Sequence, residues 1–136
     1  MNHSRCKPAA LCAALALLAT APAARALSAT ELLAEYTKAA GAASVERGQK
    51  FFATNFGKTL GFSCASCHGE QPTRSGRDQV TEKPIAPLAP AANPQRFTDR
   101  ARVDHMFRLN CRDVVGRDCT AQEKADVLAW LVSLRP

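Results

Sequence analysis

The stretch FSCASCHG, Phe62–Gly69, decides how this chain is interpreted. Cys64 and Cys67 lie three positions apart, and His68 follows the second cysteine directly. Such a run serves three chemistries: attachment of a c-type haem, a dithiol redox centre, or part of a metal site. The remainder of the chain has to favour one of them.

Residues 1–26 have the features of a cleaved secretory signal peptide. Arg5 and Lys7 precede an apolar stretch over residues 9–21, and the ARA run at 24–26 offers the small-x-small pattern of a cleavage site. The apolar stretch is shorter than the roughly 20 residues that a membrane-spanning helix needs. We therefore expect a periplasmic protein whose mature domain is residues 27–136.

A chain of this size forms one domain with a modest core. Loss of Arg5, Lys7 and Arg25 with the signal peptide lowers the formal net charge by three, from +6 to +3. The other basic residues are scattered singly, so we expect no nucleic-acid partner, and we expect a monomer. Export to an oxidising compartment would allow a disulfide between any cysteines that are not otherwise used.

Helical signals precede the cysteine pair. Ser28 with Glu31 forms a capping box, and Gly41 ends the helix that follows. Val45 and Phe52 belong to a second helical pattern. No alternating β pattern appears, so the sequence predicts an all-α fold of four or five short helices.

Helical signals return after a long proline-rich segment. Five prolines fall within residues 71–94, where a regular element is disfavoured. Thr98 can cap a helix that we expect to end near Leu109, and Thr120 with Glu123 starts the last helix. A loop this long in a small domain is usually functional, or it wraps around something.

Covalent haem explains these features best. A thioredoxin-type dithiol needs a βαβ scaffold, which the chain does not offer. A structural zinc site needs four ligands, and His105, Cys111 and Cys119 leave that alternative open by count. Haem c uses both thiols for thioethers and the following histidine for iron.

The proximal histidine needs support from the rest of the chain. A haem-ligating histidine usually donates its other ring N–H to a carbonyl, which fixes its orientation. We therefore expect His68 Nδ1 to donate to the carbonyl of Pro84 or Pro87 in the proline-rich loop.

Two residues compete for the sixth iron position. Met106 is the only methionine after the signal peptide, but it lies between Val103 and Phe107 at helical spacing, which is typical of a core residue. Asn110 lies one turn further on the same face, where we expect the helix to end. Cys111 beside it can close a loop with Cys119, eight positions later. From the residues alone, Met106 and Asn110 are about equally good candidates for the sixth iron ligand.

The stretches GQKFF, CASCHG and DVLAWLVSL resemble a class I cytochrome c. In that fold the N- and C-terminal helices cross and one haem is wrapped by short helices and a loop. Gly48 and Phe52 resemble the glycine and the aromatic residue of the crossing, and Trp130 resembles the aromatic residue that packs near the haem.

The segment RFTDRARVDHMFRLNCRDVVGRDCTAQEKADVLAWL resembles the sphaeroides haem protein (SHP) family. This resemblance implies a secreted monohaem cytochrome with haem bound to Cys64 and Cys67, iron held by His68 and Asn110, and a Cys111–Cys119 disulfide. It also implies that the asparagine leaves on reduction, so that ferrous haem binds O₂, NO or CO.

The resemblance also implies an electron donor, either a dihaem c-type or a membrane b-type cytochrome. The alternative is a closed electron carrier with Met106 on iron, in which the site stays shut. Enzymatic turnover of O₂ or nitrogen oxides is a weaker third option, because the sequence shows no acid–base pair to place over the haem. We therefore expect a non-enzymatic electron-transfer and gas-binding protein.

Overall fold

The computed structural model describes residues 26–57 and 61–136. The expected signal peptide, apart from Ala26, lies outside the described residues. Within the described part no helix is both long enough and apolar enough to cross a membrane.

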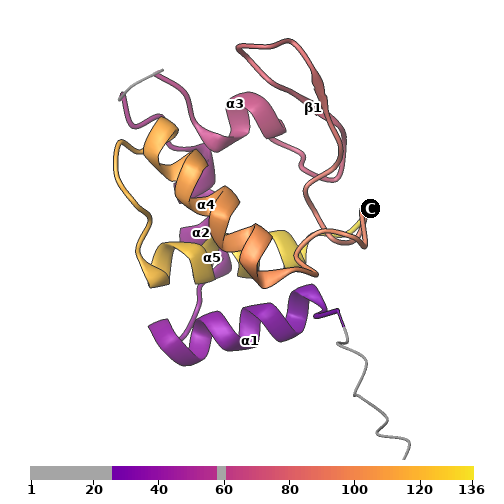
Figure 1. Ribbon diagram of the computed structural model, residues 1–136, viewed down its shortest axis with the longest axis vertical. Coiled ribbons are helices and arrows are strands. Elements are labelled where there is room, and N and C mark those ends of the chain that lie inside the picture. The colour runs from indigo at the N-terminus through magenta and orange to yellow at the C-terminus, as the bar shows by residue number, and fades with distance from the viewer. Residues whose placement is uncertain (1–25, 58–60) are drawn as a thin grey trace, which may run out of the picture.

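Five helices and one very short hairpin make up the described chain (Figure 1). The helices are α1 (Ala29–Ala40), α2 (Val45–Ala53), α3 (Cys64–His68), α4 (Arg100–Val114) and α5 (Ala121–Ser133). The strands β1 (Gly76–Arg77) and β2 (Pro84–Ile85) pair antiparallel, with Gly76 opposite Ile85. The prediction of an all-α fold with four or five short helices is confirmed, although the hairpin inside the proline-rich segment was not expected.

The helix starts follow the capping chemistry in the sequence. Ser28 accepts a hydrogen bond from the Glu31 N–H and the Glu31 side chain accepts from the Ser28 N–H, which completes the capping box of α1. Thr120 and Glu123 do the same for α5. Because these bonds satisfy N–H groups that have no partner within the helix, they fix where each helix begins.

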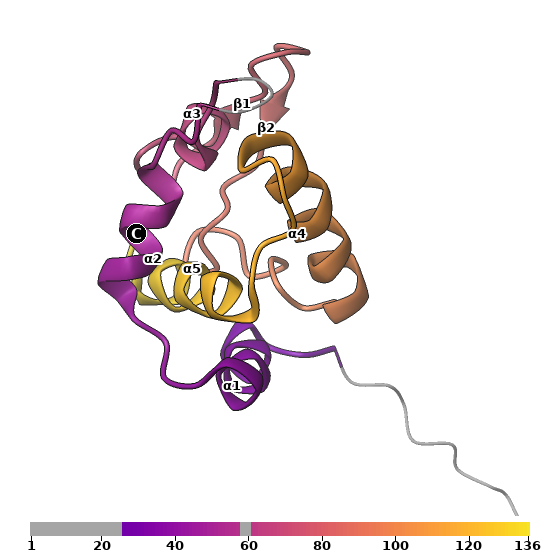
Figure 2. The same cartoon turned by 90° about the vertical axis from the view of Figure 1, so that its left-hand side faces the viewer.

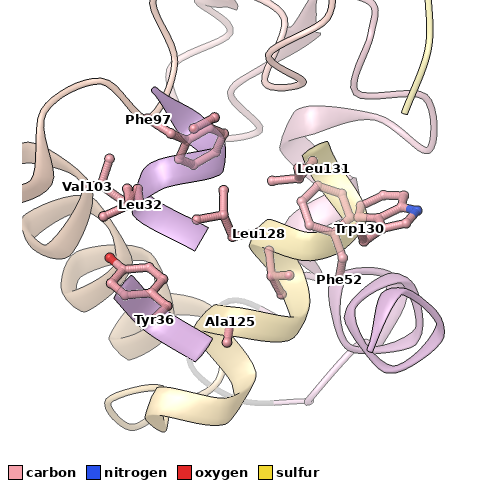
Figure 3. Packing of buried hydrophobic residues seen from close by; sticks show 11 residues of the cluster. Leu32, Tyr36, Phe52, Phe97, Val103, Ala125, Leu128, Trp130 and Leu131 are labelled. Atoms are coloured by element: carbon pink, nitrogen blue, oxygen red, sulfur yellow. The ribbon is translucent and has the colours of Figure 1, made fainter. Parts of the chain in front are cut away.

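The packed core lies where α2 and α1 contact α5 (Figure 3). A Cβ atom added at Gly48 of α2 would overlap the backbone carbonyl of Asp126 on α5, so only glycine permits this approach. One turn later, the Phe52 ring lies 4.8 Å from the Trp130 ring, centroid to centroid. The predicted roles of Gly48 and Phe52 at a helix crossing therefore agree with the structure, and Trp130 packs against Phe52.

A buried carboxylate ties the same two helices together. Asp126 is 4% exposed and accepts hydrogen bonds from the Ser44 N–H at 2.7 Å, from Arg47 Nε at 2.7 Å and from Gln122 Nε2 at 2.9 Å. Its own burial raises its pKa, but these donors outweigh burial and hold the pKa below its ordinary value. Asp126 is thus ionised and fully bonded at neutral pH.

Helix α4 is longer than the sequence predicted. Asp99, not Thr98, caps it by accepting from the Arg102 N–H, and the helix continues past Leu109 to Val114. The physical reason is that no glycine or proline follows until Gly116. The expectation that Asn110 ends a helix is therefore wrong, because Asn110 lies inside α4.

The N-terminal half of α4 is anchored to α1 and α5. The Tyr36 hydroxyl of α1 donates to Asp104 at 2.8 Å, and Lys124 of α5 lies 3.3 Å from the same carboxylate. The Tyr36 and Phe107 rings meet edge to face at 6.3 Å. These contacts fix the position of α4, whose C-terminal half lies at the same end of the molecule as α3 in both views (Figure 2).

Candidate functional site

The cysteine pair and the histidine form the short helix α3. Ser63 caps it by accepting from the Ser66 N–H at 3.1 Å, and the Ser66 hydroxyl accepts in return from the Ser63 N–H. Residues three apart on a helix share a face, so Cys64 and Cys67 are neighbours. Both are half-buried free thiols. The structure thus brings together the first three predicted site residues, with His68 directly after the pair.

The electrostatics of Cys64 disfavour dithiol chemistry. Burial raises the pKa of its thiol to about 11, and the charge of Cys67 adds to the rise. A reactive redox cysteine needs the opposite shift, because the thiolate is the nucleophile. The hairpin of two-residue strands is also no βαβ scaffold. The Cys64 thiol therefore lacks the activation that a redox dithiol needs.

His68 lies against the core and is kept neutral. Its ring centroid is 6.1 Å from that of Phe52, which in turn contacts Trp130. Burial, with a smaller effect from the Arg96 guanidinium, lowers the pKa of His68 to about 4. A neutral imidazole is the form that ligates a metal.

The expected carbonyl partner of His68 is not found. Its Nδ1 atom is buried and has no hydrogen-bond partner among the described residues. The Pro87 carbonyl accepts instead from Asn93 Nδ2 at 3.2 Å and from Arg96 Nε at 3.0 Å. The predicted bond from His68 to Pro84 or Pro87 is therefore wrong for this structure, because side chains from the same loop occupy the Pro87 oxygen.

Gly76 positions α3, and sequence reasoning missed it. A Cβ atom at this residue would overlap the Cys67 carbonyl and press on the His68 Cα. The β1–β2 hairpin can lie directly on α3 only because Gly76 has no side chain. One glycine in a proline-rich segment gives no sequence signal for such a contact.

Asn110 lies on the inward side of α4 and is nevertheless exposed. It follows Val103 by seven residues, which places it about 20° away around the helix. Val103 is buried at 9% exposure, and Cys111 beside Asn110 is buried at 6%. The side chains that continue this face toward α3 therefore have no protein covering them.

Met106 is not a core residue. It is 45% exposed, and Leu109 is 44% exposed. The expectation that Met106 packs in the core is therefore wrong. It lies about 60° from Val103 around the helix, further from the inward direction than Asn110. Exposed apolar side chains on the inner side of a helix need a covering surface.

The two remaining cysteines are joined to each other. Cys111 at the end of α4 forms a disulfide with Cys119, with Cα atoms 5.7 Å apart. Neither is then available as a thiolate ligand, and His105 is exposed, with its Nδ1 3.1 Å from an Arg108 nitrogen. In the described ranges no three metal-binding side chains gather. The zinc alternative therefore loses the ligands that it required.

Comparisons with known proteins agree on one group. Residues 38–131 match the family described as a domain of unknown function, DUF1924. The cytochrome c-type protein SHP of Cereibacter sphaeroides is 51% identical over 109 residues, covering 78% of this chain and 84% of that protein. The chain belongs to the SHP family of c-type cytochromes.

The structural relatives of this SHP-family chain give the same result. The structure of oxidised SHP, an oxygen binding cytochrome c, matches with a TM-score of 0.72 and 49% identity, covering 80% of this chain and 99% of that chain. Cytochrome c'' of Methylophilus methylotrophus is 38% identical over 115 residues, covering 78% of this chain and 80% of that protein. Its oxidised crystal structure has a TM-score of 0.71 and covers 77% of this chain and 93% of that chain.

The residues of this SHP-family protein fit one covalently attached haem c, which is the cofactor of the family. Two free thiols share one face of α3, and the neutral His68 has a buried ring nitrogen without a partner. On the α4 side, Met106 and Asn110 are exposed although their helix packs inward. A flat apolar group beside α3 would use the thiols and cover that face.

Proposed function

We propose that this protein is a monohaem cytochrome c in which Cys64 and Cys67 attach the haem and His68 and Asn110 are its axial ligands. On reduction Asn110 is released, and a diatomic gas takes its place. We further propose that residues 1–26 are removed on export, and that residues 27–136 act as a monomeric periplasmic domain. Bound haem supplies an iron that changes between Fe(III) and Fe(II) and accepts O₂, NO or CO at a free axial position.

The chemistry of Asn110 explains its release. A carboxamide oxygen is a hard, neutral and weak donor, which suits Fe(III) better than the softer Fe(II). Asn110 can rotate away because no described residue covers it. The neighbouring Cys111–Cys119 disulfide would keep the helix backbone in place meanwhile.

The exposure of Asn110 on the inward face of α4 is the observation that carries this proposal. Two relatives add support. One is described as an oxygen binding cytochrome c, and the solution structure of the other, cytochrome c'', is described as giving insight into haem-ligand detachment. Its TM-score to this chain is 0.70 at 38% identity.

The second candidate function is a closed electron carrier with Met106 on iron. The 45% exposure of Met106 favours it, since a buried core methionine would not be available. A thioether is a softer ligand that stabilises Fe(II), so the site would stay shut after reduction. An electron-donor cytochrome is expected as partner in both cases.

Two matched variants separate these candidates. If Asn110 is the ligand, Asn110→Ala opens the ferric iron to water or azide, and Met106→Leu leaves the ferric spectrum unchanged. Azide titration followed by optical and electron paramagnetic resonance spectra measures both. The opposite pattern, with Met106→Leu opening the iron and Asn110→Ala silent, establishes the closed carrier.

A further inference from the structure

The guanidinium of Arg96 is held in place without an anion. It donates from Nε to the Pro87 carbonyl at 3.0 Å and from Nη2 to the Ala86 carbonyl at 2.8 Å. These bonds fix the group in the loop before α4, where it is partly buried. Burial and then the charge of Arg102 hold the pKa of Arg96 below its usual value.

Most of the other arginines in the described part of the chain meet a carboxylate. Five of them lie within ion-pair distance of one, namely Arg47, Arg77, Arg100, Arg112 and Arg117. Neither Arg96 nor Arg102 has a carboxylate partner among residues 26–57 and 61–136. Two cations that interact with each other are unfavourable unless an anion lies between or beside them.

Arg96 is held close to α3. The two carbonyls that it bonds directly follow β2, and Gly76 of the paired strand β1 lies against the backbone of Cys67 and His68. Arg102 precedes Met106 and Asn110 by four and eight residues on α4, so it stands roughly 12 Å along the helix axis from Asn110. One cation therefore lies near the proximal ligand, and the other lies on the row of side chains that ends at the proposed distal ligand.

We propose that Arg96 and Arg102 bind the two carboxylates of the haem and thereby fix which edge of the ring points toward the start of α4. Carboxylates match the chemistry because a guanidinium offers several N–H donors to one anion. Arg96 would keep its carbonyl contacts and use its remaining donors, and Arg102 is free to turn toward the group.

This inference rests on the haem position beside α3 and not on which residue is the sixth ligand. Its failure is therefore distinct from a failure of the Asn110 assignment, which changes the ligand spectra. It is also distinct from a failure of attachment through Cys64 and Cys67, which removes the covalent haem.

The test is the midpoint potential of the holoprotein, measured by redox titration from pH 4 to pH 9. Wild type is compared with Arg96→Gln, Arg102→Gln and the double variant. Losing a cation beside a carboxylate raises the pKa of that carboxylate, by about one unit or more for a close pair. We expect the pH-dependent step in the potential to move upward by that amount, and the potential at pH 7 to fall. The double variant should show the largest change.

Arg108→Gln is the matched control, because Arg108 is an exposed α4 arginine whose contact is with His105. It should leave the titration curve in place. Arg96→Lys keeps the charge and should stay near wild type, and Arg102→Gln tests the proposal even if Arg96→Gln fails to fold. Superimposable curves for Arg102→Gln and wild type, or an equal shift in Arg108→Gln, would overturn the proposal.

Discussion

Helices α4 and α5 are similar in length but differ greatly in how they are buried. Of the 13 residues of α5, the seven consecutive residues 125–131 are buried. Of the 15 residues of α4, only Val103 and Cys111 are buried. Helix α5 is thus enclosed by protein, whereas α4 is fixed to protein through one half and leaves the other half open.

The difference shows where this fold depends on its cofactor. The α2–α5 crossing has its own close approach at Gly48, its own aromatic pair and its own ion pair to a buried carboxylate. The C-terminal half of α4 has the disulfide and exposed side chains. A helix whose inner face stays uncovered gains little burial free energy from protein alone. The stability of this half should therefore depend on haem.

The largest expected effect comes from preventing haem attachment. Cys64→Ser combined with Cys67→Ser removes both sulfur atoms that can form thioethers, so covalent haem should be lost completely. In hydrogen exchange of this apoprotein, α5 amides should stay protected while those of α4 beyond Phe107 lose protection. A haem stain on a denaturing gel checks attachment, and mass spectrometry of peptic fragments checks exchange.

Both measurements, haem attachment and hydrogen exchange, can contradict this expectation. Haem that remains on the chain in the double variant would show that Cys64 and Cys67 are not its attachment points. Equal loss of protection in α4 and α5 would mean that the two helices do not differ in their dependence on haem.

Gly48→Ala tests the close packing of α2 on α5. The added methyl group meets the Asp126 carbonyl, and a backbone group cannot swing away as a side chain can. We expect a loss of about 3 kcal/mol of unfolding free energy, the upper part of the usual range for overpacked sites. Denaturant titration measures it, with Lys50→Ala on the exposed side of α2 as the control. A loss no larger than that of the control would contradict the close crossing.

Removing the Cys111–Cys119 disulfide tests the C-terminal half of α4. The paired change Cys111→Ser and Cys119→Ser should cost about 2–3 kcal/mol, as expected for the short loop that the bridge closes. Because Cys111 adjoins Asn110, the azide-binding rate of the ferric protein should also rise. Thiol alkylation of the unreduced wild type should label neither cysteine. Unchanged azide kinetics would show that the bridge does not restrain Asn110.

The smallest expected effect is a pH dependence of the unfolding free energy that comes from Asp126, at the α2–α5 crossing. The folded-state pKa of Asp126 lies below its ordinary value of 3.8, so its stabilising contribution is present above about pH 4 and is lost as pH falls through the lower, folded-state value. Asp126→Asn should flatten the acid limb of the stability profile, measured by urea titration from pH 2 to pH 6. An unchanged acid limb in that variant would assign the loss to other carboxylates.

The helices α1, α2 and α5 could be predicted well from the sequence because their signals are local. Capping boxes at Ser28 and Thr120 mark helix starts, and the crossing at Gly48 and Phe52 is what the resemblance of GQKFF to class I cytochromes c implies. The CxxCH run specifies its own chemistry through three adjacent side chains.

Helix α4 and its surroundings were predicted less well because the contacts that decide them are not encoded in the neighbouring residues. The sequence predicts that α4 ends near Leu109, since asparagine is favoured at helix ends, but the helix passes through Asn110 to Val114. Met106 fitted a core spacing, yet its face has no protein partner. Gly76 and Arg96 act through contacts with residues eight to ten positions away, across turns of irregular chain, which helical or strand periodicity does not reveal.

The measurement that tests the central claim most directly is CO binding to the reduced wild-type protein, followed by its optical spectrum. The account predicts a high-spin, five-coordinate ferrous haem that binds CO rapidly, and a ferric spectrum without the sulfur-to-iron charge-transfer band of methionine ligation. A low-spin, six-coordinate ferrous haem that does not take up CO, together with that band in the ferric state, would contradict release of Asn110 and establish Met106 as the ligand.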